Sequence, residues 1–301
     1  MKNKFKFLVI LIFSLMISTS CAKAQKSYTS DNPAYVIYNS GGKKVSYSEM
    51  LKSVSSTDIL FFGELHNDAI SHWMELCLLK DLHGLKKEKL VVGAEMWERD
   101  NQIILDELME TKFIDLNTYI ESSVMWPNFK TDYLPLLKYA NENQIKFIAT
   151  NIPRRYARIV SKRGDAALDS LSADAKSYIA PLPIHMDLKD KFYTYIADVF
   201  KETQQTPMTG SSLTNFVKAQ MVKDATMAHS IIRNMPKGGL FFHFNGELHS
   251  AFNSGIGFYI KHYDSKLKFK TISIIKKSNI FEFSGKESRA DFNIVVPDNM
   301  S

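Results

Sequence analysis

Short apolar runs alternate along the chain with longer segments whose apolar residues recur every three or four positions. The run from Asp58 to Gly63 predicts a buried strand, and the segment from about Asp68 to His83 predicts a helix that stops at Gly84. Because strands that alternate with helices form parallel sheets covered by helices, we expect an α/β fold with a mainly parallel central sheet. The other expected strands are residues 90–94, 146–149, 240–244, 271–275 and 293–296, and the other expected helices are residues 101–109, 133–143 and 212–234.

Two segments depart from this alternation. Residues 35–38 and 44–47 flank the turn residues Gly41 and Gly42, which predicts a small β-hairpin before the first parallel strand. Residues from about 155 to 207 carry polar helical pieces and no strand pattern. We expect this segment to be a helical insertion that could cover the sheet as a lid.

The tetrapeptide Gly-Glu-Leu-His occurs twice, and each copy directly follows an apolar strand-like run. The first copy contains Glu64 and His66, and the second contains Glu247 and His249. Ligands of an open parallel sheet bind outside the carboxyl ends of its strands, so both copies would face one crevice. The plainer explanation is a chance repeat with a glycine that makes the turn, so position carries more weight than repetition.

Polar residues also follow two further predicted strands. Glu95 comes after the strand at 90–94, and Asn151 with Arg154 comes after the strand at 146–149. Such nitrogen and oxygen donors suit a divalent transition metal that could activate a water molecule. No HExxH or CxxC motif is present, and the alternative is a set of hydrogen-bonded residues that fix the strand ends. The candidate metal ligands are Glu64, His66, Glu95 and His249, with Glu95 preferred over Glu247.

Three polar residues on predicted helices could lean over the same crevice. His72 follows Asp68 by four residues, so both lie on one helix face. Gln220 and Asp224 have the same spacing. The alternatives are a surface or half-buried histidine and an ordinary polar helix face.

The N-terminus predicts export. Residues 1–20 combine lysines, an apolar stretch shorter than a membrane span needs, and small residues before Cys21. This pattern predicts a signal peptide over residues 1–20, lipidation of Cys21 and a polar tether over residues 21–33 that leads to a single domain over 34–301. The alternative is cleavage after Ala24 by ordinary signal peptidase, which would release a soluble periplasmic or secreted protein.

Charge and length limit the remaining function classes. The chain has 301 residues and a formal charge of +6, of which residues 1–20 contribute three lysines. Without them 35 basic residues face 32 acidic ones, a net charge of +3. Such a balance does not indicate nucleic-acid binding.

Six blocks of sequence follow one another in order through most of the mature chain. They are Gly63-Glu64-Leu65-His66 with His72, Gly93-Ala94-Glu95-Met96 with Arg99-Asp100, Tyr133-x-Pro135-Leu136-Leu137 with Tyr139-Ala140, Asn151-x-Pro153-Arg154, Ala219-Gln220 with Asp224-Ala225-Thr226-Met227-Ala228, and Gly246-x-x-His249. Together they resemble the ChaN-like haem-binding lipoproteins. That family shares a superfamily with the Tiki metalloproteases and, more distantly, with erythromycin esterases.

The resemblance implies a three-layer α/β/α fold and a lipoprotein of the bacterial outer membrane or cell envelope that acquires iron by binding haem. It also implies haem held between the subunits of a homodimer, with a tyrosine on the iron and histidine near the propionates. The candidate tyrosines are Tyr133, Tyr156 and Tyr178. The candidate haem-binding residues are His66, His72, Tyr133, Asn151, Arg154, Gln220, Asp224 and His249.

Two functions of different classes follow from these observations. The first is a lipid-anchored protein that binds haem and has no catalytic turnover. The second is a metal-dependent hydrolase, similar to the Tiki proteases or the esterases, in which Glu64, His66, Glu95 and His249 hold a metal or exchange protons. Of these two functions, we expect haem binding without catalytic turnover.

Overall fold

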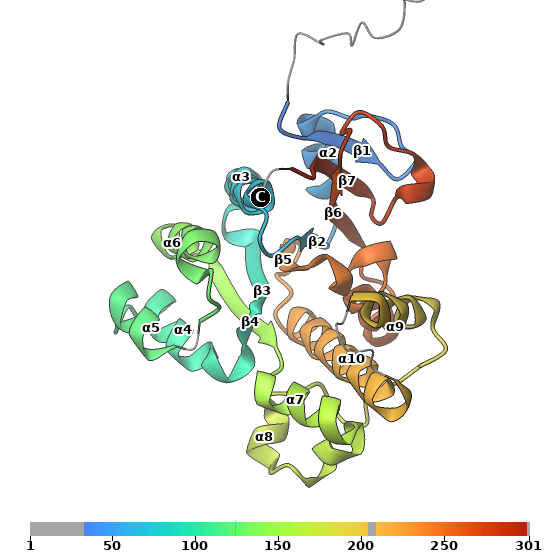
Figure 1. The fold of residues 1–301 in the computed structure, drawn as a ribbon. Coiled ribbons are helices and arrows are strands. Elements are labelled where there is room, and N and C mark those ends of the chain that lie inside the picture. Colours follow the sequence, from blue (N-terminus) through green and yellow to red (C-terminus); the bar gives the residue numbers. More distant parts are fainter. Residues whose placement is uncertain (1–32, 124, 204–208, 300–301) are drawn as a thin grey trace, which may run out of the picture. The chain divides into compact units, whose positions relative to one another are not determined.

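The structure is a computed structural model that describes residues 33–123, 125–203 and 209–299 (Figure 1). From Ala34 onward these residues belong to one compact unit. The expected signal peptide, the lipidated Cys21 and all but the last residue of the tether lie outside the described residues. Within the described residues, no helix has both the length and the apolar character that crossing a bilayer requires.

Seven strands of the described chain form one sheet in the order β1-β7-β6-β2-β5-β3-β4. All neighbours in this sheet are parallel except β1, which pairs antiparallel with β7. This arrangement confirms the predicted α/β fold. The strands are β1 (Val36–Asn39), β2 (Ile59–Glu64), β3 (Leu90–Glu98), β4 (Lys146–Asn151), β5 (Leu240–Gly246), β6 (Phe269–Lys277) and β7 (Phe292–Pro297).

Both faces of the sheet are buried under helices, which explains why the central strands are apolar at almost every position. In β2, Leu60 and Phe62 pack with α3 (Ala69–Lys86) and α6 (Leu134–Glu142), whereas Ile59 and Phe61 pack with α10 and α11. Side chains alternate between the two faces because the strand has a period of two residues. Figure 1 shows α3 and α6 on one side of the strands and α10 (Gly210–Arg233) on the other. Helix α11 is Ile256–Tyr263.

The predicted hairpin is wrong in its second half. The first arm becomes β1, but Lys44 makes only an isolated bridge with Tyr38. The chain then enters helix α2 (Tyr47–Val54), because Ser46 and Glu49 form a capping box: the Ser46 side chain accepts from the Glu49 amide, and the Glu49 carboxylate accepts from the Ser46 amide. Helix α3 also continues through Gly84 instead of stopping there.

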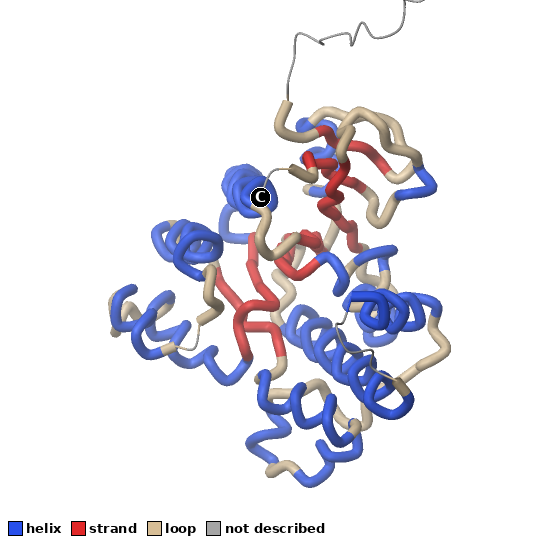
Figure 2. Tube along the Cα trace, viewed as in Figure 1, coloured by secondary structure: helices blue, strands red, loops and turns tan. Residues whose placement is uncertain are grey.

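The segment predicted as a helical insertion contains helices and loops and no strand from Arg154 to Thr203, a stretch that is wholly described (Figure 2). Its helices are α7 (Arg154–Arg163), α8 (Ala173–Ser177) and α9 (Lys191–Thr203). Helix α7 packs on α10 and extends the helical layer past the edge of the sheet. Helix α9 lies over the carboxyl ends of the central strands, where its side chains line a cavity.

Strand β4 forms one edge of the sheet, and the side chain of Gln102 occupies part of that edge. Its amide nitrogen donates to the Phe147 carbonyl at 3.1 Å, and its amide oxygen accepts from the Ala149 amide at 2.7 Å. Gln102 begins helix α4 (Gln102–Met109), which is followed by α5 (Leu116–Ser122). The glutamine thus imitates a neighbouring strand and satisfies backbone groups that an unpaired edge would expose.

Candidate functional site

A cavity of about 780 Å³ opens at the carboxyl ends of β2, β3 and β5, and we call it the strand-end cavity. Both Gly-Glu-Leu-His copies reach it, because Glu64 of β2 lies beside Gly246 of β5 in the parallel register. Its walls come from α9 and α10, and its volume lies in the usual range for small-molecule sites. Of the predicted residues, those that line it are Glu64, His66, Glu95, Gln220, Asp224 and His249.

The first copy forms a hydrogen-bonded group with Tyr133. His66 Nδ1 lies 2.6 Å from Glu64 Oε1, and the Tyr133 hydroxyl donates to the same oxygen at 2.6 Å. Burial would raise the pKa of Glu64, but its hydrogen bond with His66 lowers it. Burial and the neighbouring Glu64 carboxylate raise the pKa of Tyr133 above its usual range. Tyr133 is therefore a neutral, fully buried donor that does not line the cavity.

His72 and Glu75 extend this group inward from α3. His72 Nδ1 lies 3.2 Å from Glu75 Oε2 and 3.6 Å from Glu64 Oε2. Burial and the charge of Glu64 raise the pKa of Glu75 well above its usual range. Glu64 and Glu75 share a side-chain hydrogen bond, which requires a proton on one of the two carboxyl groups and adds to the rise in the pKa of Glu75.

The second copy places His249 between two buried carboxylates. Its Nδ1 lies 2.5 Å from Asp224 Oδ1, and its Nε2 lies 3.1 Å from Glu95 Oε1. Burial alone would lower the pKa of His249, but the charges of Glu95 and Asp224 raise it to about 10. His249 is therefore an imidazolium at neutral pH. Asp224 also accepts from the Tyr193 hydroxyl at 2.8 Å.

The two copies meet at Gly246. Its amide donates to Glu95 Oε2 at 2.9 Å. A Cβ atom at this position would lie only 2.8 Å from His66 Nε2, so glycine is needed for the imidazole to approach the strand. Burial would lower the pKa of His66, but its hydrogen bond with Glu64 and the charge of Glu95 raise it.

The four predicted metal ligands share the cavity but do not form one coordination group. His66 pairs with Glu64, and His249 pairs with Asp224 and Glu95. In the described part of the chain, the only set of three donor residues whose ligand atoms all lie within 4.8 Å is Glu64, His72 and Glu75. Sequence reasoning missed Glu75, although a carboxylate three residues after His72 on the buried face of a helix was a usable signal.

The remaining predicted residues lie around the cavity or away from it. Asn151 is buried and donates to the Glu95 carbonyl at 3.0 Å, so it supports β3. Arg154 is exposed and pairs with Glu98 outside the cavity. Tyr156 packs against α10 in a separate apolar cluster, and Tyr178 lines a different cavity.

An aromatic wall and basic residues complete the strand-end cavity. Phe192, Tyr195 and Phe200 on α9 face it, and sequence reasoning missed them although their spacing marks one helix face. The ring of Tyr195 packs edge-on against Phe252 at 5.3 Å. Phe252 has a φ of 57° and a side chain that is 48% exposed. The basic residues of the cavity are Lys223, Lys276 and Arg289.

A solved structure with a TM-score above 0.5 shares this fold. The structure described as "Cofacial heme binding to ChaN of Campylobacter jejuni" superposes with a TM-score of 0.69 and 18% identity, covering 88% of this chain and 98% of that one. A Bacillus cereus protein gives a TM-score of 0.44 at 13% identity, covering 76% and 68% of the two chains. An erythromycin esterase in its open conformation gives 0.43 at 10% identity, covering 81% and 77%. No curated protein sequence matches the chain.

The family profile described as "Haem-binding uptake, Tiki superfamily, ChaN" matches residues 50–260. This match covers more than half of the 301 residues and both Gly-Glu-Leu-His copies. The chain therefore belongs to the ChaN family of haem-binding uptake proteins in the Tiki superfamily.

Proposed function

We propose that the protein binds haem in the strand-end cavity as part of haem and iron uptake. The observation that carries the proposal is one cavity of about 780 Å³ with an aromatic wall and three basic residues, in a chain of the ChaN family. Aromatic faces suit the flat apolar porphyrin, and cationic side chains suit its propionates. The residues therefore fit haem, which would supply the bound iron.

Tyr195 is the tyrosine best placed to contact the iron. It is half-buried and lines the cavity. Tyr193 also lines the cavity but is buried and donates its hydroxyl to Asp224, and Tyr133 is buried and donates its hydroxyl to Glu64. A phenolate oxygen is an established haem ligand, but Tyr133 resists ionisation because its pKa is raised. His66, whose side chain is 38% exposed, also lines the cavity.

We further propose that the protein acts outside the cytoplasm, anchored in the membrane through a lipid on Cys21. The export pattern of residues 1–20 supports this proposal. Cleavage after Ala24 remains the alternative and would release a soluble protein. A homodimer with haem between its subunits fits the exposed Phe252, which lines a neighbouring cavity together with Phe192 and Tyr195 and whose ring a second copy would cover.

Titration with haemin tests the proposal directly. Protein lacking residues 1–24 is titrated with micromolar haemin while the Soret band is recorded, and bound metals are measured by elemental analysis. We expect saturable binding that weakens when Lys223, Lys276 and Arg289 are changed to glutamine together, with little effect of the exposed Lys138→Gln control. No spectral change, together with stoichiometric zinc or manganese, would refute haem binding.

A metal-dependent hydrolase is the second candidate, favoured by the group of Glu64, His72 and Glu75. One ligand atom from each of these three residues lies within 4.8 Å of the other two, and carboxylate and imidazole groups suit zinc or manganese. The hydrolase predicts bound metal in the wild type and its loss in Glu75→Gln, with Glu142→Gln as an exposed control. It also predicts that Glu64→Ala abolishes turnover in a folded protein, whereas haem binding would largely survive that change.

A further inference from the structure

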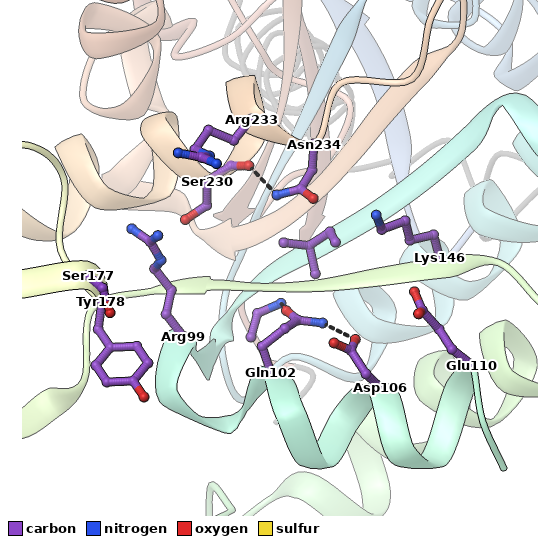
Figure 3. Close-up of a pocket in the computed structure, with 12 residues that line it drawn as sticks. Arg99, Gln102, Asp106, Glu110, Lys146, Ser177, Tyr178, Ser230, Arg233 and Asn234 are labelled. Atoms are coloured by element: carbon purple, nitrogen blue, oxygen red, sulfur yellow. Dashed lines mark hydrogen bonds between the residues drawn. The ribbon is translucent and has the colours of Figure 1, made fainter. Parts of the chain in front are cut away.

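A cavity of about 380 Å³ lies beside β4 at the edge of the sheet, and we call it the edge cavity (Figure 3). It shares no lining residue with the strand-end cavity. Its walls come from the segment after β3, from α4, from the end of α8 and from the end of α10. Figure 3 shows Arg99 and Arg233 near one end and Asp106, Glu110 and Lys146 toward the other.

The basic end holds two arginines that lack a carboxylate partner within the described chain. Arg99 Nη1 is buried and has no hydrogen-bond partner there. The acidic residues on either side of Arg99 form ion pairs with other arginines: Glu98 pairs with Arg154, and Asp100 pairs with Arg155. Guanidinium groups that approach one another without an anion between them are unfavourable unless a ligand neutralises them.

The electrostatics of neighbouring groups agree with this geometry. Burial and the charge of Arg233 lower the pKa of Arg99. Burial, with the charges of Arg99 and Arg233, lowers the pKa of His229 to about 4. His229 Nδ1 is also buried without a hydrogen-bond partner among the described residues. Arg99 in the cavity wall and the nearby His229 therefore both experience an excess of positive charge.

We propose that the basic end of the edge cavity binds a small oxyanion, the phosphate or carboxylate group of a polar small molecule. Arg99 and Arg233 would supply charged donors, and the side chains of Tyr178 and Asn234 in the wall would add neutral ones. The cavity is larger than an inorganic ion. Asp106 and Glu110 would repel a second anionic group at the far end, so the ligand carries its negative charge at one end only.

Calorimetric titration with inorganic phosphate tests this site, with ionic strength held constant by chloride. We expect saturable binding that becomes at least tenfold weaker in Arg99→Gln and in Arg233→Gln. Arg158→Gln removes the same charge from an exposed position on α7 outside the cavity and should bind like the wild type. Acetate and sulfate in place of phosphate show whether carboxylates and other oxyanions are also accepted.

A second measurement keeps the test independent of folding. Arg233 is exposed, so its substitution should leave the fold intact. In the wild type, the pKa of His229 measured by nuclear magnetic resonance should rise when phosphate saturates the site, because the anion offsets the arginine charges. Absence of saturable phosphate binding, or equal affinity in Arg99→Gln, Arg233→Gln and Arg158→Gln, would overturn the proposal.

Discussion

At the scale of single residues, buried histidines around the strand ends are held by carboxylates. His249 is the clearest case, since Asp224 and Glu95 lie on its two nitrogens and keep it charged. A buried ion pair contributes little compared with apolar packing, but removing one partner leaves a buried charge unpaired. These residues therefore hold the cavity floor in place as well as shaping its charge.

The stability that His249 contributes should depend on pH. Its pKa rises from about 6.5 in the unfolded chain to about 10 in the folded protein, so its contribution is fully present below pH 6.5 and is lost as the pH rises through 10. We expect His249→Gln to cost about 3–5 kcal/mol of unfolding free energy at pH 6, and the difference from wild type to shrink toward pH 10. Denaturant unfolding at several pH values measures it.

The exposed Lys138→Gln provides the control for this series. Lys138 pairs with Glu142 at 3.9 Å on the surface of α6, and such pairs contribute under about 0.5 kcal/mol. A His249→Gln penalty that stays constant from pH 6 to pH 10 would contradict a charged His249.

Replacing Phe252 with glycine should stabilise the folded protein. The φ of 57° at Phe252 is a left-handed conformation that costs a bulky side chain about 1 kcal/mol. Phe252→Gly should therefore raise the unfolding free energy by up to about 1 kcal/mol. Phe281 is 47% exposed, against 48% for Phe252, and has no positive φ. Phe281→Gly should instead lower it by about 0.5–1 kcal/mol, and equal effects of the two changes would contradict the strain at Phe252.

Site residues differ in how far the sequence alone predicts them. Glu64, His66, Glu95 and His249 could be found because residues after buried strands share one edge of a parallel sheet. The sequence could not predict which imidazole pairs with which carboxylate, because these pairs depend on side-chain contacts such as the approach of His66 to Gly246. Tyr195 was missed because thirteen tyrosines compete by type, and only the fold shows that Tyr193 and Tyr195 line the cavity at the strand ends.

At the scale of elements, the strands and the long helices follow from periodicity, whereas their ends depend on local chemistry. The capping box at Ser46 was visible in the sequence and converts the second hairpin arm into α2. The continuation of β3 to Glu98 was not visible. Its pairing with β4 becomes irregular between Ala94 and Glu98, so Glu95 lies within the strand and not after it.

The contact between the Gln102 side chain and the edge strand β4 should stabilise the fold. Because this side chain satisfies two backbone groups of the edge strand β4, Gln102→Ala should cost about 1–3 kcal/mol and speed hydrogen exchange at the Ala149 amide. Ile103→Ala changes the next residue of α4, which is 72% exposed, and should leave that exchange rate unchanged. Equal exchange in the two variants would mean that the glutamine does not protect the edge.

At the scale of the whole molecule, one sheet presents two cavities with different chemistry. The strand-end cavity combines an aromatic wall with a carboxylate and imidazole floor, and the edge cavity is polar with a basic end. The sequence predicts the first of these, because parallel topology places its ligands at the strand ends. The sequence does not predict the edge cavity, because residues from five separated parts of the chain line it, namely the segment after β3, α4, β4, the end of α8 and the end of α10.

A haemin titration of two tyrosine variants tests the central claim most directly. Tyr195→Phe removes the hydroxyl of a tyrosine that lines the cavity, so we expect loss of the tyrosinate-type Soret spectrum and weaker haem binding with unchanged stability. Tyr133→Phe removes the buried donor to Glu64 and should cost about 1–3 kcal/mol of unfolding free energy while haem binding survives. An unchanged spectrum in Tyr195→Phe, with loss of binding in folded Tyr133→Phe, would contradict haem binding through Tyr195 in the strand-end cavity.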